Sequence, residues 1–337
     1  MQRSSLNLEK NLHIRLKCMQ ENSPQIAVVI PCYKVTEHLV GVVDSIGPEV
    51  STIFIVDDAC PDGSGLFLQS NSRDKRLKYI FHEDNQGVGG AVLSGYKAAL
   101  ETGAEVIVKL DGDGQMDPSL ISVIAKPVIE GHADYAKGDR FDSLENLFGM
   151  PRIRIFGNAV LSLWAKLSTG YWSITDPTNG FTAIHRRALE AINLDKVRSS
   201  YFFESDMLFR LNIANCVVAD VPMAARYGSE TSSLKIRKVL FEFPWRHTVN
   251  LFKRVFYRYY LREWNVGSFE LPVSLALLFF GAWFGLTSYS NAAAAGVSTT
   301  AGQATASAVS LILGVQLLLS FISYDVQSEP RIPRQRR

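Results

Sequence analysis

Two carboxylates stand two residues apart in the run KLDGDGQMDP at residues 109–118. Asp111 and Asp113 follow a short apolar segment, and residues i and i+2 of an extended chain point the same way. The glycines beside them let a bulky anion approach the backbone closely. Carboxylate oxygens suit a hard divalent cation, which often bridges carboxylates to substrate phosphates. The sequence therefore predicts an Mg²⁺ or Mn²⁺ site, with Gln115 adding a carbonyl oxygen or fixing a bound water.

A second acidic pair, Asp57 and Asp58, closes the apolar run TIFIV. A carboxylate at the carboxyl end of a strand can accept hydrogen bonds from a base or a ribose. The alternative is an aspartate that caps a helix starting near Gly63. Pro31 and Tyr33 end an earlier apolar run, which would place an aromatic ring beside the same crevice.

The elements that would position these residues alternate in type. Short apolar, β-branched runs typical of strands buried on both faces of a parallel sheet alternate with helix-like stretches. The predicted strands are 26–31, 52–57, 77–82, 106–110, 180–185 and 217–222, and the predicted helices are 36–46, 89–102, 119–130, 146–167 (interrupted at Pro151) and 205–214. Such strand–helix units imply an open α/β sheet with ligands at the carboxyl ends of its strands. The glycine-rich run NQGVGGA opens a helix but lacks G-x-G-x-x-G, so it does not support a dinucleotide fold.

Composition narrows the class of protein. The chain has 337 residues, 47% of them hydrophobic and 20% charged, which excludes a disordered chain, a collagen-like repeat and a coiled-coil rod. A formal net charge of +2 does not favour nucleic acid as a partner. The four cysteines form no C-x-x-C pair, so we expect reduced thiols rather than a disulfide framework or a zinc site. The sequence leaves the oligomeric state open, a homo-oligomer included.

The last third of the chain differs from the rest. No Asp, Glu, Lys, Arg or His occurs from 271 to 324. The stretches 268–288 and 305–324 are each long enough to cross ~30 Å of hydrocarbon, which predicts a transmembrane hairpin. Arginines precede the first stretch and follow the second, so the positive-inside rule predicts that both ends are cytoplasmic. The basic, aromatic run 235–262 predicts two amphipathic helices, divided at Pro244, on the membrane surface. Packing of this run against the α/β domain is the alternative.

Four segments in this order and spacing, IAVVIPCY, IVDDACPDGS, EDNQGVGGAVLSGYKAAL and VKLDGDGQMDP, resemble glycosyltransferase family 2. The closer resemblance is to polyprenyl-phosphate glycosyltransferases such as dolichol-phosphate mannose synthases, over about residues 26–234. It implies the GT-A fold, an open, mostly parallel nucleotide-sugar-binding sheet flanked by helices. The expected domains are an N-terminal arm (1–24), the GT-A catalytic domain (25–234), amphipathic juxtamembrane helices (235–267), two transmembrane helices (268–326) and a basic cytoplasmic tail (327–337).

The resemblance also assigns site residues. It implies nucleotide contacts by Pro31, Tyr33, Asp58 and Asp111, and a metal motif of Asp111, Asp113 and Gln115. It implies an acceptor-phosphate site of Arg140, Arg154, Arg226 and Lys235, although Lys235 lies two residues beyond the family's lysine position, which Ser233 occupies here. The candidate catalytic residues are Asp113, Arg140, Asp176 and Asp206.

The function implied is metal-dependent, inverting transfer of a sugar from a nucleoside-diphosphate sugar to a polyprenyl phosphate, undecaprenyl or dolichyl. We expect the enzyme in the inner membrane, with its catalytic domain in the cytoplasm. A phosphate acceptor is already anionic near neutral pH and needs no general base. The alternative acceptor is a hydroxyl of a lipid-linked glycan or a polysaccharide precursor, which would need a base, with Glu204 and Asp206 as candidates. The sequence does not select the sugar or the nucleotide base.

Overall fold

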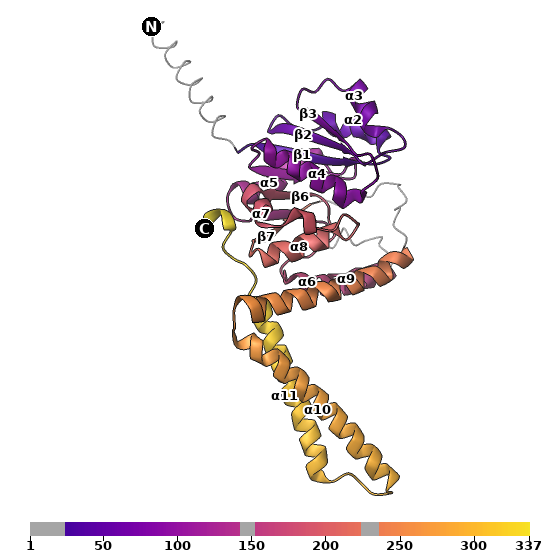
Figure 1. Ribbon diagram of the computed structural model, residues 1–337, viewed down its shortest axis with the longest axis vertical. Coiled ribbons are helices and arrows are strands. Elements are labelled where there is room, and N and C mark those ends of the chain that lie inside the picture. Colours follow the sequence, from indigo (N-terminus) through magenta and orange to yellow (C-terminus); the bar gives the residue numbers. More distant parts are fainter. Residues whose placement is uncertain (1–23, 142–151, 224–235) are drawn as a thin grey trace.

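The computed structural model describes residues 24–141, 152–223 and 236–337. It shows an α/β domain, a long helix across the base of that domain, and a helix pair that projects away from it (Figure 1). The predicted N-terminal arm, apart from Pro24, lies outside the described residues.

In the described part of the chain, seven strands form one sheet in the order β3-β2-β1-β4-β6-β5-β7. The strands are β1 (Ile26–Cys32), β2 (Val50–Asp57), β3 (Leu77–Phe81), β4 (Val106–Lys109), β5 (Tyr135–Asp139), β6 (Thr182–His185) and β7 (Val218–Pro222). Only β6 runs against its neighbours, so its first residue, Thr182, pairs with Lys109 at the end of β4. The start of β6 therefore lies at the same sheet edge as the carboxyl ends of the other strands. The mostly parallel sheet is confirmed.

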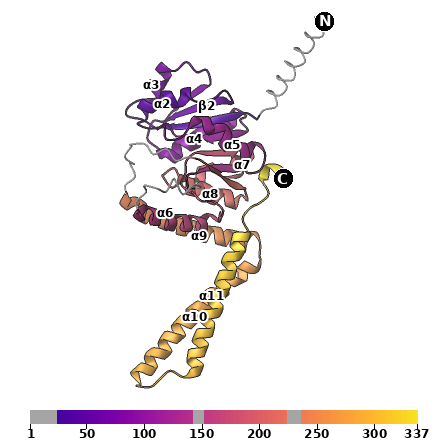
Figure 2. The same ribbon diagram turned by 180° about the vertical axis from the view of Figure 1, so that it is seen from behind.

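Helices cover both faces of the sheet (Figures 1 and 2). They are α2 (Thr36–Asp44), α3 (Ser64–Asn71), α4 (Gly87–Glu101), α5 (Ile121–Ile129), α6 (Arg152–Thr169), α7 (Arg186–Ala191) and α8 (Phe203–Ile213). Alternate residues of β1 enter two separate cores: Val29 packs with Tyr96 of α4, and Val28 packs with Leu39 of α2. Burial on both faces explains why the central strands are continuously apolar.

Strand β5 was not among the predicted strands. Its sequence, YAKGD, carries a lysine at the centre, which breaks the apolar pattern that marks the other strands. Lys137 is nevertheless fully buried and donates a hydrogen bond to the backbone carbonyl of Asp176. Burial lowers the pKa of this lysine, and the nearby carboxylates of Asp176 and Asp220 oppose that effect.

Helix α9 (Ile236–Phe256) runs unbroken through Pro244, so the division expected there is wrong. A six-residue π-helical turn, η4 (Tyr257–Arg262), follows it directly. His247 and Asn250 are buried where α9 packs against α6 and α8, and this packing holds the proline-containing turn in helical form. The expected alternative, packing against the α/β domain, is therefore present on one face of α9. Its other face exposes large apolar side chains, with Trp245 69% exposed.

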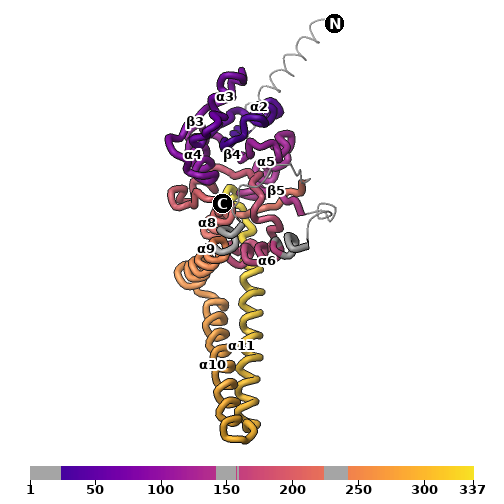
Figure 3. The backbone as a smooth tube through the Cα atoms, turned by 90° about the vertical axis from the view of Figure 1, so that its right-hand side faces the viewer, coloured from indigo at the N-terminus to yellow at the C-terminus, as the bar shows by residue number. Residues whose placement is uncertain are grey.

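Among the described residues, two helices are long and apolar enough to cross a membrane, α10 (Val266–Ala294) and α11 (Ala301–Gln327). They lie side by side as a hairpin (Figure 3). Ser274 Oγ donates to the Gly314 carbonyl at 2.9 Å, and Ser307 Oγ donates to the Gly281 carbonyl at 2.8 Å. Small residues at these contacts let the two backbones approach closely, as in membrane helix pairs.

A buried ion pair joins the hairpin to the α/β domain. Arg254 of α9 is 1% exposed and forms a two-pronged pair with Asp325 of α11, with N–O distances of 2.7 and 3.0 Å. The same guanidinium caps α6 by donating to the Leu167 carbonyl at 2.7 Å. Asp325 also accepts hydrogen bonds from the Tyr259 hydroxyl at 2.6 Å and the Trp172 indole at 2.9 Å. Four segments thus meet at one carboxylate.

The basic tail expected at 327–337 folds back onto the α/β domain. The backbone N–H groups of Arg334 and Gln335 donate to the Asp134 carboxylate at 2.8 and 3.2 Å. The Gln335 side-chain amide donates to the carbonyls of Val128 and Ala133 at the end of α5. The chain therefore returns from the hairpin to the edge of the sheet beside β5 and β7.

Replacing Asp325 by alanine should destabilise the protein by about 3–5 kcal/mol, because Arg254 would remain buried without its anion. Thermal unfolding in detergent measures this loss. The control is Glu263→Ala, which removes an exposed carboxylate close by and should leave the unfolding midpoint unchanged. Equal midpoints for the two variants would contradict the assignment.

Acid should weaken the docking of α9. Burial lowers the pKa of His247 to about 4, and its Nδ1 lies 2.7 Å from Ser168 Oγ. A histidine in the unfolded chain has a pKa of ~6.5, so the unfolded state takes up a proton before the folded state does as the pH is lowered. The free energy of unfolding therefore decreases as the pH drops from ~6.5 to ~4. Between pH 7 and pH 5, His247 should lower it by about 2 kcal/mol. Thermal unfolding of His247→Gln at both pH values should show a smaller loss than wild type, whereas the exposed His132→Gln should match wild type. Equal losses in all three would refute the prediction.

Candidate active site

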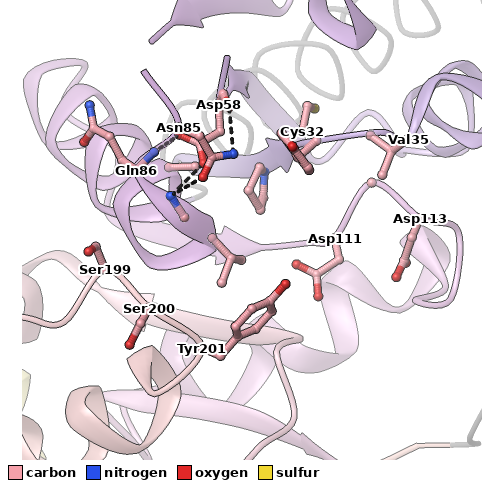
Figure 4. Close-up of a pocket in the computed structure, with 16 residues that line it drawn as sticks. Cys32, Val35, Asp58, Asn85, Gln86, Asp111, Asp113, Ser199, Ser200 and Tyr201 are labelled. Atoms are coloured by element: carbon pink, nitrogen blue, oxygen red, sulfur yellow. Dashed lines mark hydrogen bonds between the residues drawn. The ribbon is translucent and has the colours of Figure 1, made fainter. Parts of the chain in front are cut away.

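A cleft of about 640 Å³ opens at the carboxyl edge of β1, β2 and β4 (Figure 4). The ends of these strands form one wall, and the segment Ser199, Ser200 and Tyr201, just before α8, forms the other. The predicted residues Pro31, Tyr33, Asp58, Asp111 and Asp113 all line this cleft. The sequence reasoning missed the opposite wall, because nothing in the local pattern of 199–201 shows that the segment packs against α4.

Asp58 is 3% exposed, and its carboxylate binds protein groups. One oxygen lies 2.7 Å from His82 Nδ1 and accepts from the Gln86 backbone N–H at 2.8 Å, and the other accepts from the Gly87 N–H at 2.8 Å. His82 in turn lies 2.9 Å from Ser94 Oγ. Asp58 therefore orders the loop that begins α4. His82 was given no role from the sequence, since its contact with Asp58 is made only by the pairing of β2 with β3.

The glycine-rich run seats one wall of the cleft against the other. The N–H groups of Gly89 and Gly90 donate to the Ser199 carbonyl at 3.0 and 3.3 Å. A Cβ on Gly89 would lie 2.7 Å from the Arg198 carbonyl, so only glycine permits this approach. Gly87 has a φ of +81°, which also favours glycine. These N–H groups at the start of α4 are occupied by the protein, and the run acts as a packing surface.

The loop after β1 fixes Tyr33 at the mouth of the cleft. The Lys34 N–H donates to Cys60 Sγ at 3.1 Å, and the Val35 N–H donates to Ser64 Oγ at 3.2 Å. Partial burial would raise the pKa of the Cys60 thiol, but hydrogen bonds from Ser64 and Lys34 together outweigh it and lower the pKa. The residues after β1 and β2 are thus joined, and the 45%-exposed Tyr33 ring borders the cleft.

A buried lysine lies beneath the acidic residues. Lys109 Nζ is 3.0 Å from Asp111 Oδ1 and 3.3 Å from Glu204 Oε1. Burial opposes the charge on Lys109, but the carboxylates of Asp111 and Glu204 outweigh it and raise its pKa above the usual value. Gly180 leaves the room for this cluster, since a Cβ there would lie 2.4 Å from Lys109 Nζ.

The acidic loop fits a hard divalent cation held jointly with a ligand. Asp111 and Asp113 both line the cleft (Figure 4). Asp113 Oδ1 accepts a hydrogen bond from the Gln115 N–H at 3.0 Å. Gln115 is exposed and is not among the residues that line the cleft. Within the described ranges, no group of three or more His, Cys, Asp or Glu side chains could hold a metal by itself. A cation here would take its remaining ligands from water and substrate phosphates, as Mg²⁺ commonly does.

Arg140 and Asp176 meet outside the lining of the cleft. Arg140 follows β5, Asp176 precedes β6, and both lie at the same edge of the sheet as Asp111. Arg140 Nε donates to Asp176 Oδ2 at 2.7 Å and its Nη2 donates to Oδ1 at 3.1 Å. Burial would raise the pKa of Asp176, but the guanidinium outweighs this and lowers it. Asp176 therefore holds the Arg140 side chain in place.

The remaining predicted residues lie elsewhere. Asp206 does not line the cleft; its carboxylate accepts from the Arg198 N–H at 3.0 Å, from Arg210 Nε at 2.9 Å and from Asn250 Nδ2 at 3.2 Å. These contacts are structural. Arg154 belongs to α6, but its side chain is outside the described part of the chain, as are Arg226 and Lys235 altogether.

Comparison with known proteins identifies the family. The model for glycosyl transferase family 2 matches residues 27–192. Polyprenol monophosphomannose synthase of Mycolicibacterium smegmatis is 31% identical over 225 residues, which cover 64% of this chain and 84% of the relative. The chain belongs to glycosyltransferase family 2. Undecaprenyl-phosphate mannosyltransferase of Micrococcus luteus is 30% identical, over 59% of this glycosyltransferase and 82% of the relative. UDP-N-acetylglucosamine–dolichyl-phosphate N-acetylglucosaminyltransferase of Methanococcus voltae is 28% identical, over 60% of this chain and 86% of the relative.

Solved structures agree on the fold of this glycosyltransferase. Glucosyl-3-phosphoglycerate synthase from Mycobacterium tuberculosis, in complex with Mn²⁺, UDP and phosphoglyceric acid, superposes with a TM-score of 0.52 at 17% identity. The match covers 68% of this chain and 78% of that one. The same enzyme in complex with Mg²⁺ and UDP gives a TM-score of 0.50, and this match covers 68% of this chain and 79% of that one. The expected GT-A fold is confirmed.

Replacing Gly89 by alanine should push the 198–201 wall away from α4 and, if the cleft takes the nucleotide-sugar donor expected from the sequence, weaken its binding roughly tenfold, because small displacements of positioning groups are costly. Donor titration by calorimetry in detergent measures the change. Gly41→Ala is the matched control, since a Cβ on that helical glycine of α2 meets nothing within 4 Å. Unchanged affinity in Gly89→Ala would show that the two walls do not need this contact.

Proposed function

We propose that this enzyme transfers a sugar from a nucleoside-diphosphate sugar to the phosphate of a membrane polyprenol. The observation that carries the proposal is the cleft itself, which Asp111 and Asp113 line together with Pro31 and Tyr33 at the strand ends. Three relatives that are 28–31% identical over most of their length are all named as transferases to a polyprenyl or dolichyl carrier. The nucleotide would lie between β1, β2 and the 199–201 wall.

The proposed reaction is a single displacement at the anomeric carbon. An oxygen of the lipid phosphate forms the new bond to that carbon while the bond to the donor diphosphate breaks, and the nucleoside diphosphate leaves with the electron pair. The attacking phosphate is already ionised near neutral pH, so no side chain has to remove a proton. This displacement inverts the configuration of the sugar.

Charge control is the main task of the site residues in this proposal. Asp111 and Asp113 would hold Mg²⁺ or Mn²⁺, which when bound offsets the negative charge that develops on the leaving diphosphate. Lys109 Nζ, 3.0 Å from Asp111 Oδ1, orients the Asp111 carboxylate from beneath. Arg140, fixed by Asp176, would hold the acceptor phosphate, because a guanidinium binds phosphate through two parallel hydrogen bonds. Arg154, Arg226 and Lys235 remain proposed partners of the same phosphate.

The membrane arrangement follows from the same proposal. We place α10 and α11 across the membrane as two spans, with the catalytic domain and both termini in the cytoplasm, where nucleotide sugars are made. The return of the tail to Asp134 supports this arrangement, because it puts the end of α11 on the same side as the start of α10. An inner-membrane location follows if the source is bacterial.

The test is transfer of radiolabel from a panel of nucleotide sugars to undecaprenyl phosphate by the purified chain in detergent. We expect label that is extracted into organic solvent, that requires Mg²⁺ or Mn²⁺, and that falls about 10²–10³-fold in Asp113→Asn, since loss of one group that stabilises transition-state charge costs this much. Asp62→Asn, a change of the same kind in the loop after β2, should retain activity. Metal-independent labelling, or full activity of Asp113→Asn, would overturn the metal assignment.

A further inference from the structure

A second concavity runs along α9 on the side that faces α8. Two cavities of about 710 Å³ each share Phe209, Arg210 and Lys253, so they form one continuous groove. We call it the basic groove and define it by its cations, which are Lys196, Arg198, Arg210, Arg246, Lys253, Arg262 and Arg334. Of the described lining residues, only Ser199 borders both this groove and the candidate active-site cleft. The basic groove is therefore a separate site.

The cations of the basic groove outnumber its acids. Each carboxylate that lines it is already paired: Asp206 with Arg210 at 2.9 Å, Glu242 with Arg246, and Asp195 at 2.7 Å with Lys97, which lies outside the groove.

Five cations are left over. Lys196, Arg198 and Lys253 are exposed and make no ion pair with any described carboxylate. The guanidinium groups of Arg262 and Arg334 form no ion pair with a described carboxylate and donate to the carbonyls of Ile213 and Ala214 at the end of α8. This surplus of positive charge favours an anionic ligand.

The groove also presents apolar surface at the depth of a membrane interface. Trp245, Phe256, Tyr257 and Leu261 line it and are exposed. Helix α10 begins at Val266, four residues after Arg262, so the far end of the groove lies where the first apolar span starts. Figures 1 and 2 show α9 across the base of the domain, at the end of the hairpin. Tryptophan and tyrosine are the residues enriched at this depth, beside lipid headgroups.

We propose that the basic groove binds the phosphate headgroups of anionic glycerophospholipids of the surrounding bilayer. The unpaired cations of the groove would bind the phosphodiester, and the aromatic side chains would contact the upper acyl chain. Lipid is favoured over a soluble polyanion because the groove lies level with the start of α10 and combines cations with exposed aromatic rings. The proposal concerns the attachment of α9 to the bilayer surface and is independent of which sugar is transferred.

The test is retention of lipid by the full chain in detergent, measured by native mass spectrometry during titration with phosphatidylglycerol or phosphatidylcholine. Wild type should bind phosphatidylglycerol at least tenfold more tightly than phosphatidylcholine, and added salt should reduce this difference in affinity. The triple variant Lys196→Gln, Arg198→Gln and Lys253→Gln should lose about tenfold or more of that affinity, since each cation near the surface contributes to attraction of anionic lipid.

The matched control removes the same charge elsewhere. The control is a triple variant with the substitutions Arg73→Gln, Lys75→Gln and Lys78→Gln, which lie in or just before β3. Strand β3 is at the end of the domain far from α9 (Figure 1), so this variant should bind phosphatidylglycerol like wild type. Equal retention of the two lipids by wild type would show that the cations do not select an anionic headgroup, and overturns the proposal. Unchanged binding in the first triple variant, or an equal loss in the control, does the same. No sugar donor is present, so the outcome does not depend on transfer activity.

Discussion

The pairing of Arg254 with Asp325 determines how the parts of this protein are held together. A guanidinium and a carboxylate that are both almost fully buried need further hydrogen bonds beyond their own pairing to offset the loss of water. Here the Leu167 carbonyl accepts from Arg254, and the Tyr259 hydroxyl and the Trp172 indole donate to Asp325. Arg254 Nε is the one buried N–H group of the pair without a partner among the described residues. Gly170 leaves the space, because a Cβ there would lie 2.7 Å from Arg254. The apolar hairpin, α9 and the end of α6 are therefore held in one arrangement, which fixes the height of the cleft above the start of α10.

Within the domain, the sheet topology imposes a comparable constraint on the chemistry. Parallel strands end at one edge, and the reversed strand β6 starts there, so Asp58, Asp111, Arg140 and Asp176 are brought to the same side from distant parts of the chain. Lys109 compensates the carboxylates from below, at the end of β4. Acidic and cationic side chains from several strands therefore lie on one side of the sheet, at the strand ends.

The sequence was enough to predict the strand ends and the acidic residues near them. Buried parallel strands are continuously apolar, and this pattern located six of the strands, while Asp111 and Asp113 were identifiable from their place after one of them. Tertiary contacts determined the rest. The buried Lys137 interrupts the apolar pattern by which a strand such as β5 is recognised. The second wall of the cleft exists because residues 198–201 pack on Gly89. Helix α9 continues through Pro244 where it packs against α6 and α8. Arg254 is one of the arginines that precede the first predicted span, and its burial against Asp325 depends on contacts between distant segments.

In the proposed reaction a lipid phosphate, rather than a hydroxyl, attacks the sugar. The mass of the lipid product and the identity of the released nucleotide test this most directly, with polyprenyl phosphate and the matching polyprenol offered in parallel. We expect a product that carries one sugar on one phosphate, release of the nucleoside diphosphate, and no product from the polyprenol. A product with the sugar on a hydroxyl, or release of the nucleoside monophosphate, would contradict it.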